Sequence, residues 1–474
     1  MTTSAHPPQT SAQTSDAHPT QPGPRATASR RLRRPARPRP LAVDALAAAA
    51  GLGLGASLAL AVSTQTSGSL SARGGLLTAA GMIAGMLAGY AMICVVLLSA
   101  RIPPLERTMG QDRLIGWHRR LAPWALYLLA AHITLITLGY AQAAGTDPLT
   151  QIWRLLTEYP EVLPAAAGAG LLAMAGVTSY RRARARMAYE TWWAVHLYTY
   201  LGLGLSFLHQ VDNGAPFVGH PLARLWWYTL WLGTLATVLA FRVALPLYRS
   251  WRHGLRIAQI VPAGPRTWAV TLTGRDLDRL PAAGGQFLLW RFLRRGLWWQ
   301  AHPYSLSAAP RGSQLRITVK ELGDHSSALA RLTTGTRVAF EGPYGTFTQD
   351  TRTARDVVLV GAGVGATPIR ALLGELPEGT HAVVVLRGHR REHIAHLDEF
   401  ERILGRRRGG QLHVLTGPRE HVRLDGDALR ELVPDIAARE VYVCGPVPFT
   451  GLVVDAATAA GVPAHRIHHE DFSF

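Results

Sequence analysis

Four histidines in two long apolar stretches are the residues of this chain best suited to metal or redox chemistry. Two lie fourteen positions apart within 116–140, and two lie thirteen positions apart within 191–211. They are His118 and His132 in the first stretch and His196 and His209 in the second. Ionisable side chains are costly at membrane depth, so four of them in apolar surroundings indicate a functional site.

The histidine spacing predicts two separate levels of ligation. A helix rises about 1.5 Å per residue, so fourteen residues separate the levels by roughly 20 Å. One zinc ion, with bonds to histidine of about 2.0–2.1 Å, cannot serve both levels. Two six-coordinate haems fit, with His118 opposite His196 and His132 opposite His209. The alternative is that each histidine is a hydrogen-bonded packing residue, but matching depths on two parallel helices favour ligation.

The second stretch carries a geometric difficulty. At about 100° per residue, fourteen residues return to within about 40° of the same helix face, whereas thirteen miss it by about 140°. We therefore expect a kink or tightening near Gly202 and Gly204, or haems that present different sides to this helix. His209 fits the pattern least well of the four ligands. His220 and His253, which lie in connecting segments without such a pattern, are expected to be solvated.

The elements that must position these histidines are membrane helices. The chain is 48% hydrophobic and only 17% charged, and six apolar segments reach the ~20 residues that a bilayer crossing needs. The segments are 41–62, 75–99, 116–140, 160–179, 191–211 and 223–247. The sequence therefore predicts a six-helix transmembrane domain over 41–250.

Basic residues predict the orientation of these helices. The arginine-rich connections are those with Arg101, Arg107 and Arg113, with 181–186, and with Arg249, Arg252 and Arg256. The opposite set holds only Arg73, Arg154 and Arg224. Since cytoplasmic loops carry the excess of arginine, both termini are expected in the cytoplasm and the protein in the cytoplasmic membrane.

The N-terminal segment 1–40 is rich in Pro, Ser, Thr and Arg and is predicted to be disordered. Its basic end could also be read as the start of a signal peptide cleaved after Ala61. The long apolar run 41–62 and the spans that follow favour a retained first helix.

Composition excludes several other functions. The net charge of +18 comes almost wholly from arginine beside apolar segments, with a single lysine, Lys320. A nucleic-acid-binding protein would instead gather basic and aromatic residues on one face. The two cysteines, Cys94 and Cys444, are too few for a cysteine-based zinc or iron–sulfur site. A disulfide is not expected, because one lies in an apolar span and the other in the soluble part.

After residue 255 the pattern changes to soluble folds. Short β-patterned runs over 255–350 predict a small antiparallel barrel or sandwich, with the barrel preferred. Strand and helix patterns alternate over 355–474 and predict a parallel α/β domain.

Six spans with paired histidines in the third and fifth resemble the ferric reductase and NADPH oxidase superfamily of transmembrane flavocytochromes b. That family also has a slightly shorter histidine spacing in its fifth span. The resemblance implies two b-type haems and a flavin reductase in the soluble half. Arg119 and Arg120 could pair with haem propionates, although a positive-inside role alone explains them.

The segment HPYSLSAAP (302–310) resembles the flavin-binding strand of the ferredoxin–NADP reductase superfamily. The resemblance implies that Tyr304 and Ser305 meet the isoalloxazine and ribityl groups of FAD. His302 stands where many relatives have arginine and is expected to face the flavin phosphates, with Pro303 beside it. An ordinary strand is the alternative for this segment taken alone.

Two further segments extend the flavin resemblance. In VKELGDHSSAL (319–329), Gly323 would let the pyrophosphate approach, and Ser326 and Ser327 would offer hydroxyls. The segment EGPYGTF (341–347) closes the flavin domain in the family. Three segments in the family order favour FAD over three unrelated turns, so the resemblance makes 255–350 an FAD-binding barrel.

The segment VVLVGAGVGATPIRALL (357–373) reads as strand, glycine turn and helix. Gly361, Gly363 and Gly365 would let a dinucleotide phosphate approach the helix start, where Thr367 and Pro368 follow. Such turns also serve only to connect a strand to a helix.

The strand that follows ends in Arg387, with Arg390 three residues on. An arginine at this place suits a 2′-phosphate, which favours NADPH over NADH, unless both are surface residues of an arginine-rich chain.

The segment VYVCGP (441–446) resembles the strand before the nicotinamide, which places Cys444, Gly445 and Pro446 near the hydride path. Cys444 could equally be a small buried residue. In the family a C-terminal aromatic covers the flavin, a role that falls here to Phe474 or to Phe472.

The sequence thus predicts an oxidoreductase that passes electrons from cytoplasmic NAD(P)H through FAD and two b-type haems to ferric iron or oxygen outside. One alternative is an electron-delivery subunit that reduces an external protein. Another is a membrane anchor or sensor without activity, which the intact flavin and nicotinamide motifs disfavour. The acceptor and the oligomeric state stay open at this point.

Overall fold

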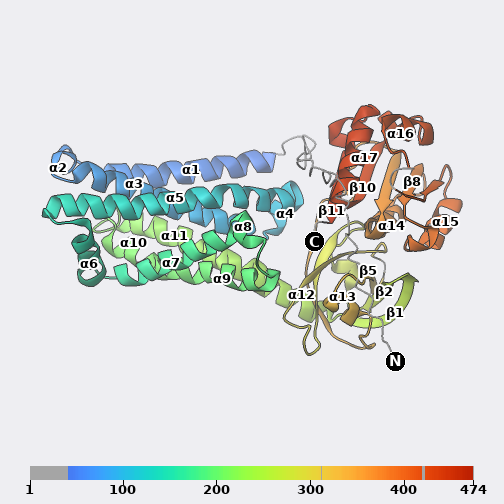
Figure 1. Cartoon of the computed structure of the whole chain (residues 1–474), viewed down its shortest axis with the longest axis horizontal. Helices are drawn as coiled ribbons and strands as arrows, with labels where there is room; N and C mark the ends of the chain where they lie inside the picture. Colours follow the sequence, from blue (N-terminus) through green and yellow to red (C-terminus); the bar gives the residue numbers. More distant parts are fainter. Residues whose placement is uncertain (1–40, 311, 419–421, 473–474) are drawn as a thin grey trace, which may run out of the picture. The chain divides into compact units, whose positions relative to one another are not determined.

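The computed structural model describes residues 41–310, 312–418 and 422–472 (Figure 1). The segment 1–40, predicted to be disordered, and the C-terminal Phe474 lie outside the described residues.

An apolar helical domain forms the N-terminal part, as predicted. Its long helices are α1 (Leu41–Ser63), α3 (Gly75–Ser99), α5 (Gln111–Ala144), α7 (Val162–Ser179), α9 (Tyr189–Leu205) and α11 (Pro221–Val238). Shorter helices lie between them: α2 (Ser67–Ser71), α4 (Pro103–Met109), α6 (Pro148–Glu158), α8 (Arg181–Arg184) and α10 (Phe207–Asn213). Five described helices are long and apolar enough to cross a membrane, and α9, with 17 residues, is not among them. The six-crossing topology therefore stays a prediction.

Small residues on helix α3 let helix α5 approach it closely. A Cβ added at Gly81 on α3 would lie 2.9 Å from the Ile136 side chain on α5, and one at Gly85 would lie 2.5 Å from the His132 ring. Close helix packing in lipid depends on such small residues, because hydrophobicity alone does not draw apolar helices together there. Glycine on α3 thus brings α5 and its histidines against it.

The fifth segment is broken just after the two glycines, near the place predicted, and the Ser206 N–H donates to the Gly202 and Gly204 carbonyls. Helix α9 ends at Leu205, and α10 begins at Phe207 after Ser206. Gly202 also packs against α7, since a Cβ there would lie 2.8 Å from the Gly168 carbonyl. The glycine therefore serves helix contact, and the break follows it by a few residues.

The last span also departs from a regular helix. After α11 the chain makes a π-helix over Leu239–Ala244 and then α12 (Leu245–His253). Pro246, which has no N–H to donate, lies at the first turn of α12 and accounts for the irregular hydrogen bonding before it. His253 at the end of α12 was predicted to be solvated, which is wrong. It is 3% exposed, with Nδ1 2.9 Å from the Arg275 carbonyl.

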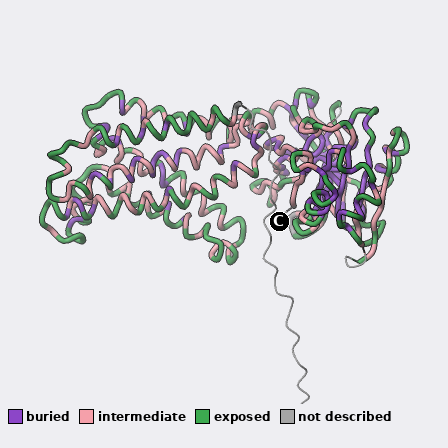
Figure 2. Tube along the Cα trace, turned by 90° about the horizontal axis from the view of Figure 1, so that it is seen from above, coloured by how far each residue is buried: buried purple, intermediate pink, exposed green. Residues whose placement is uncertain are grey.

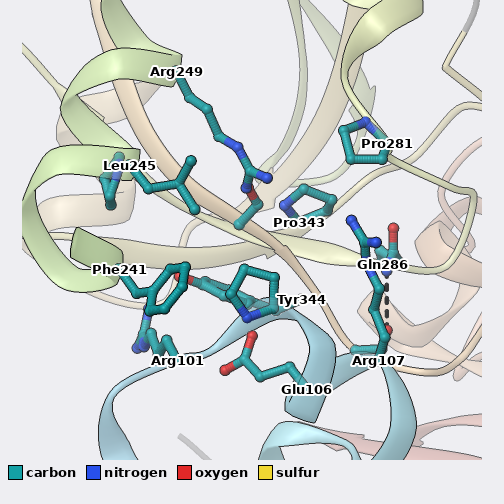
Figure 3. Close-up of a pocket in the computed structure, with 14 residues that line it drawn as sticks. Arg101, Glu106, Arg107, Phe241, Leu245, Arg249, Pro281, Gln286, Pro343 and Tyr344 are labelled. Carbon is teal, nitrogen blue, oxygen red and sulfur yellow. Dashed lines mark hydrogen bonds between the residues drawn. The ribbon is translucent and has the colours of Figure 1, made fainter. Parts of the chain in front are cut away.

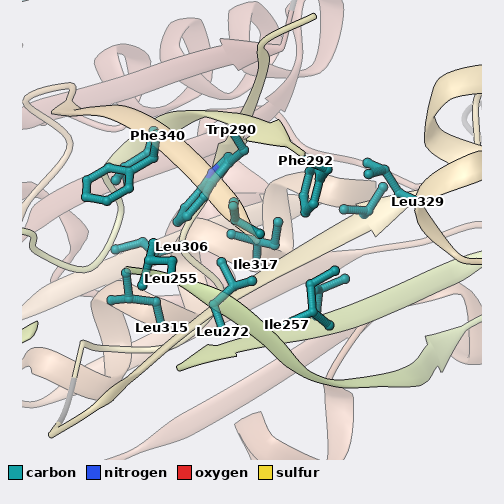
Figure 4. Packing of buried hydrophobic residues seen from close by; sticks show 14 of the residues in the cluster. Leu255, Ile257, Leu272, Trp290, Phe292, Leu306, Leu315, Ile317, Leu329 and Phe340 are labelled. Atoms are coloured by element: carbon teal, nitrogen blue, oxygen red, sulfur yellow. The ribbon is translucent and has the colours of Figure 1, made fainter. Parts of the chain in front are cut away.

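Two antiparallel sheets follow the membrane helices. One has the order β1-β2-β5, and the other has the order β4-β3-β6. Their bounds are β1 (Arg256–Gly264), β2 (Thr267–Thr273), β3 (Phe287–Phe292), β4 (His302–Ser305), β5 (Gln314–Lys320) and β6 (Val338–Tyr344). Isolated bridges, such as Leu306 with Ile317, join the two sheets. Apolar side chains around Trp290, which is fully buried, fill the space between them (Figure 4).

The C-terminal part is a five-stranded parallel sheet with the order β11-β10-β7-β8-β9. Its strands are β7 (Val357–Ala362), β8 (Ala382–Arg387), β9 (Gln411–Leu415), β10 (Glu440–Pro446) and β11 (Ile467–Phe472). The main helices are α14 (Ala366–Glu375), α15 (Leu397–Gly405), α16 (Gly426–Leu432) and α17 (Val447–Ala459). All six residues of β7 are buried, as expected for a strand covered on both faces. Strand β11 was not predicted.

Figure 2 shows buried positions gathered in these sheet domains and many exposed positions along the long helices. Many of these exposed helix residues are large and apolar. Outward apolar side chains on long helices suit a lipid environment, where burial inside the protein is not needed.

One ionic cluster joins the two sheet domains. Glu399 on α15 accepts two hydrogen bonds from Arg316 on β5, at 2.7 and 2.9 Å, and lies 2.5 Å from Arg370 on α14. Although burial acts to raise the pKa of Glu399, hydrogen bonds from His396 and Arg316 and the charges of both arginines hold it well below its usual value. The carboxylate therefore stays charged and fixes strand β5 to helices α14 and α15 of the parallel α/β domain.

Candidate functional site

The four histidines meet in the two pairs that their spacing predicts. The ring centroids of His118 and His196 lie 6.2 Å apart, and those of His132 and His209 lie 6.0 Å apart. The break at Ser206 lets His209 face α5 despite the thirteen-residue spacing. Each pair thus joins α5 to the fifth segment at its own level.

These separations fit an iron held between two imidazoles. A ring nitrogen lies about 1.2 Å from its ring centre and a metal–imidazole bond is about 2.0–2.1 Å, so axial ligands place their centroids about 6.4 Å apart. Within the described part of the chain, no group of three or more His, Cys, Asp or Glu side chains could hold a bare metal ion. A porphyrin, which supplies the other four iron ligands itself, suits a site with only two protein ligands.

Hydrogen bonds prepare two of the rings for such a role. His118 Nδ1 lies 2.9 Å from the Val95 carbonyl, and His132 Nδ1 lies 2.8 Å from the Gly81 carbonyl. Since a carbonyl only accepts, each Nδ1 donates its proton and leaves Nε2 as the free electron pair that a metal needs. Both carbonyls belong to α3, so this helix orients both rings of α5.

The partner rings are held differently. His196 stacks on Trp192 at 5.1 Å, and its Nδ1 lies 3.4 Å from the Ser179 hydroxyl. His209 Nδ1 is buried without a hydrogen-bond partner among the described residues. Arg119 and Arg120, more than two turns into α5, are exposed.

The flavin-binding candidates lie on β4. His302 and Tyr304 stack at 6.3 Å, and the Tyr304 carbonyl accepts a hydrogen bond of 3.0 Å from Trp290. Burial raises the pKa of Tyr304, which keeps the phenol neutral. Ser305 is 5% exposed, and its hydroxyl has no partner among the described residues. An unsatisfied buried hydroxyl at this place fits a polar ligand such as the flavin. Pro303 between them is exposed.

Glu470 on β11 is a site residue that the sequence did not predict. A Cβ added at Gly345 would lie 3.6 Å from Glu470 Oε1 and 3.5 Å from the Phe287 ring. Phe287 pairs with Ser305 across the sheet. Burial raises the pKa of Glu470 to about 8, assisted by the charges of Asp112 and Asp471. The carboxyl is therefore mostly protonated at neutral pH. Nothing in the local pattern of a short C-terminal strand indicates such burial.

The link from this carboxyl to the histidines is short. Asp112, whose charge acts on Glu470, lies in the first turn of α5, six residues before His118. At ~1.5 Å per residue this is about 9 Å along the helix. The start of α5 therefore acts electrostatically on Glu470, and His118 lies further along the same helix.

The second flavin segment uses its polar groups internally. Ser326 accepts hydrogen bonds from the backbone N–H groups of Leu322 and Gly323, at 2.8 and 3.0 Å, and donates to the Gly323 carbonyl. Ser327 is partly buried on the same short helix, α13 (Asp324–Leu329). A Cβ on Gly323 would meet open space, so room for a ligand exists there.

The glycine turn after β7 is shaped mainly by packing. Gly363 has φ +56°, and a Cβ on Gly365 would overlap the Cys444 carbonyl. A Cβ on Gly361 would lie 3.2 Å from Ala366. These glycines let α14 approach β10 closely, as in dinucleotide-binding turns. Thr367 and Pro368 are buried in the first turn of α14, and the Thr367 hydroxyl donates to the Val364 carbonyl at 2.7 Å.

The two arginines proposed for nicotinamide selectivity differ in access. The Arg387 guanidinium donates to the Gly417 carbonyl at 2.6 Å and also to the Gly388 and Leu415 carbonyls. Arg390 is exposed and lies 3.5 Å from Glu392. Arg390 is therefore the more accessible of the two to a 2′-phosphate.

Cys444 on β10 is fully buried, and burial together with Glu470 and Asp471 raises the pKa of its thiol well above the usual value. The thiol is neutral and packs among apolar side chains. Gly445 faces Phe449, since a Cβ there would lie 2.8 Å from that ring, and Pro446 is exposed. Phe472 lies in β11, and its side chain, like all of Phe474, is outside what the structure describes.

Comparison with known families identifies two parts of the chain. Residues 84–207 match the family described as ferric reductase like transmembrane component. Residues 269–348 match the family described as FAD-binding domain.

Curated relatives match about half of the chain. The ferredoxin reductase component of 3-ketosteroid-9-alpha-monooxygenase from Mycolicibacterium smegmatis is 34% identical over 230 residues, which cover 46% of this chain and 65% of that protein. A flavohemoprotein from Xylella fastidiosa is 30% identical over 238 residues, which cover 47% of this chain and 60% of that protein. The chain thus spans less than two thirds of the length of these relatives.

Two solved structures show weaker likeness. The flavohem-like FAD/NAD-binding domain of nitric oxide dioxygenase from Vibrio cholerae matches with a TM-score of 0.41 and 25% identity, over 47% of this chain and 99% of that one. A flavohemoglobin from Malassezia yamatoensis matches with a TM-score of 0.42 and 17% identity, over 85% of this chain and all of that one.

Substitution of one histidine in each pair tests the ligation. We expect His118→Ala and His132→Ala each to lose one of two haems per chain, because a haem held between two helices needs both axial ligands. The haem-to-polypeptide ratio of the purified variants measures this. His220→Ala, which removes an exposed histidine, is the matched control and should keep both haems. A ratio that stays at two in His118→Ala and His132→Ala would contradict the assignment.

Glu470→Gln tests the buried carboxyl through pH. The folded chain keeps a proton on Glu470 that the unfolded chain loses between about pH 4.5 and 8, so this group lowers stability as pH rises through that window. Glu470→Gln removes the titration and should melt at least about 3 °C above the wild type at pH 8, with the gap closing toward pH 5. Glu431→Gln, at an exposed position, is the control. A difference in melting temperature between Glu470→Gln and the wild type that stays the same from pH 5 to pH 8 would contradict the raised pKa of Glu470.

Proposed function

We propose that this chain, a member of the ferric reductase and NADPH oxidase superfamily by its transmembrane component and its flavin domain, is a transmembrane oxidoreductase. It takes electrons from cytoplasmic NAD(P)H through FAD and two b-type haems to an acceptor on the opposite side of the membrane. The acceptor is ferric iron or oxygen.

The observation that carries this proposal is the pair of opposed imidazoles at each of two levels. Their centroid separations of 6.2 and 6.0 Å match the span of an iron with two axial histidines. The bilayer core is about 30 Å thick, so electrons need more than one stop to cross it. Two levels roughly 20 Å apart along α5 supply those stops.

The soluble half supplies the other end of the path. Ser305 and Tyr304 on β4 would hold the flavin ring, and His302 would face its phosphates, while the turn at Gly361–Gly365 would receive the nicotinamide dinucleotide. When bound, a flavin accepts two electrons as a hydride and gives them up singly, which is what haem iron requires. Glu470, buried and protonated beside Gly345, keeps a negative charge away from this point.

The arginine distribution supports the orientation. Arg101, Arg107 and Arg249 lie at the same ends of the helices as the inner pair His118 and His196. Positive residues favour the cytoplasmic side, so the soluble half and both termini are assigned to the cytoplasm of a cell whose plasma membrane holds the chain. Helices α9 and α10 together provide the sixth crossing.

Turnover by the purified chain tests this proposal. With NADPH and no partner protein, the chain should reduce ferric chelate or oxygen, the latter detected as superoxide. If NADPH reduces the haems but neither acceptor is consumed, the chain is instead an electron-delivery subunit for an external protein. Failure of NADPH and NADH to reduce any haem would contradict both readings.

Nicotinamide preference tests the exposed arginine. Arg390→Asp should lower the kcat/KM ratio of NADPH to NADH by about tenfold, since a hydrogen bond to a charged group contributes roughly 1.5–3 kcal/mol. Arg391→Asp changes the same charge at the next residue and should leave the ratio unchanged. Arg387→Asp tests the nearby arginine whose guanidinium donates to backbone carbonyls. An unaltered ratio in both Arg390→Asp and Arg387→Asp would remove the support for a 2′-phosphate contact.

The C-terminal aromatic has a separate test. Phe474→Ala should change the discrimination between NADPH and NADH several-fold, because a ring that covers the flavin must leave before nicotinamide enters. Phe474→Trp keeps a planar ring and should restore the wild-type ratio. Steady-state kinetics with both nucleotides measure this, and identical constants for all three proteins would argue against a covering ring.

A further inference from the structure

A hollow lies where the inner ends of the membrane helices meet strand β6 (Figure 3). Its cavity volume is about 40 Å³, within about 550 Å³ of space that includes the open mouth. Its charged lining consists of Arg101, Glu106, Arg107 and Arg249. The histidine pairs and strand β4 do not contribute to it, while Gly342–Gly345 of the flavin-closing segment lines one side, so the hollow adjoins the proposed flavin site.

One of its arginines is already neutralised. Arg101 lies 3.0 Å from Glu341 on β6, and its guanidinium stands over the Tyr344 ring at 4.7 Å. Glu341 also lies 3.6 Å from both Arg242 and Arg291, so one carboxylate serves three guanidiniums. The region is therefore rich in positive charge even before the remaining arginines are counted.

Two arginines of the hollow have no acid to balance them. Arg249 donates to the uncharged Gly342 carbonyl, and within the described residues neither Arg249 nor Arg107 lies within ion-pair distance of a carboxylate. The two guanidiniums also repel each other. Burial raises the pKa of Glu106 to about 7, so this carboxyl carries only a partial charge at neutral pH. An anion placed between Arg107 and Arg249 would relieve the repulsion.

The walls show which side of the hollow faces lipid. Phe241 and Leu245 line it and belong to the apolar run Pro221–His253, one of the candidate membrane spans. On the same helix Tyr248 is 50% and Trp251 74% exposed. Exposed aromatic residues of this kind mark the level of lipid headgroups. The hollow thus has an apolar wall that continues from the bilayer and a cationic floor at headgroup depth.

We propose that this hollow binds the phosphate of an anionic phospholipid of the inner leaflet between Arg107 and Arg249, with the acyl chains leaving along Phe241 and Leu245. The bound phosphate would tie the segment after α3 to the end of strand β6, where the flavin-closing residues Gly342–Tyr344 lie. Binding itself is independent of the proposed function, whereas a gain in turnover from bound lipid rests on it.

Lipid retention gives the direct test. The full chain is purified from bilayers of phosphatidylcholine with phosphatidylglycerol, and the phosphatidylglycerol that stays bound is counted by native mass spectrometry. Arg107→Gln should weaken retention about fivefold, the factor that corresponds to about 1 kcal/mol per basic residue at an anionic surface. Arg252→Gln, which removes an arginine on α12 that pairs with Asp276 outside the hollow, is the matched control and should retain lipid.

Two further measurements distinguish a lipid phosphate from free phosphate and guard against misfolding of the arginine variant. Leu245→Trp fills the apolar wall without changing charge and should also release the lipid. Inorganic phosphate at matched concentration should not protect the chain against heat as phosphatidylglycerol does. Equal retention in Arg107→Gln and Arg252→Gln, or equal protection by free phosphate, would overturn the lipid assignment.

The effect on turnover is measured in the same bilayers. Ferric chelate reduction should rise several-fold when phosphatidylglycerol is added to phosphatidylcholine, and Arg107→Gln should lose the rise but keep the basal rate. Retention with no change in rate would overturn the coupling to turnover and leave the binding site standing. Absence of any basal rate in a haem-loaded chain would instead contradict the proposed function, which the retention measurement does not involve.

Discussion

The close contact between α3 and α5 is the constraint on which the candidate site depends. Gly85 leaves the space that the His132 ring occupies, and the Gly81 carbonyl accepts the proton of that ring at 2.8 Å. The Val95 carbonyl does the same for His118 one level further in. A side chain at Gly85 would displace the ring and with it the opposed pair. The third helix therefore acts as the template that orients both ligands of α5.

The second requirement is continuity between the soluble half and these rings. Helix α5 begins beside Glu470, through Asp112, and reaches His118 after fewer than two turns. Arg249 and Ser250 at the end of the last span bond to the backbone of β6, at Gly342 and Phe340. Strand β6 is thus bound to the membrane helices at residues that close the proposed flavin site. Under the proposed function, these bonds would fix the flavin end of the electron path relative to the helices.

Much of the fold follows from sequence, because long apolar runs and β patterns are local signals. The segment predicted at 75–99 coincides with α3, and the histidines meet in the two predicted pairs. The failures have tertiary causes. The use of Gly202 for contact with α7 depends on a neighbouring helix. Burial of Glu470 depends on strands distant in sequence, and the Ser326 hydroxyl forms its hydrogen bonds within its own turn.

The proposed function depends on iron held between imidazoles on α5 and on the fifth segment. Electron paramagnetic resonance and magnetic circular dichroism of the oxidised, purified chain report axial ligation directly. Two low-spin, six-coordinate haems with bis-imidazole spectra are the expected result, because each ring pair leaves no open iron position. A high-spin, five-coordinate spectrum at both levels, or a chain that binds no haem when haem is abundant, would contradict it.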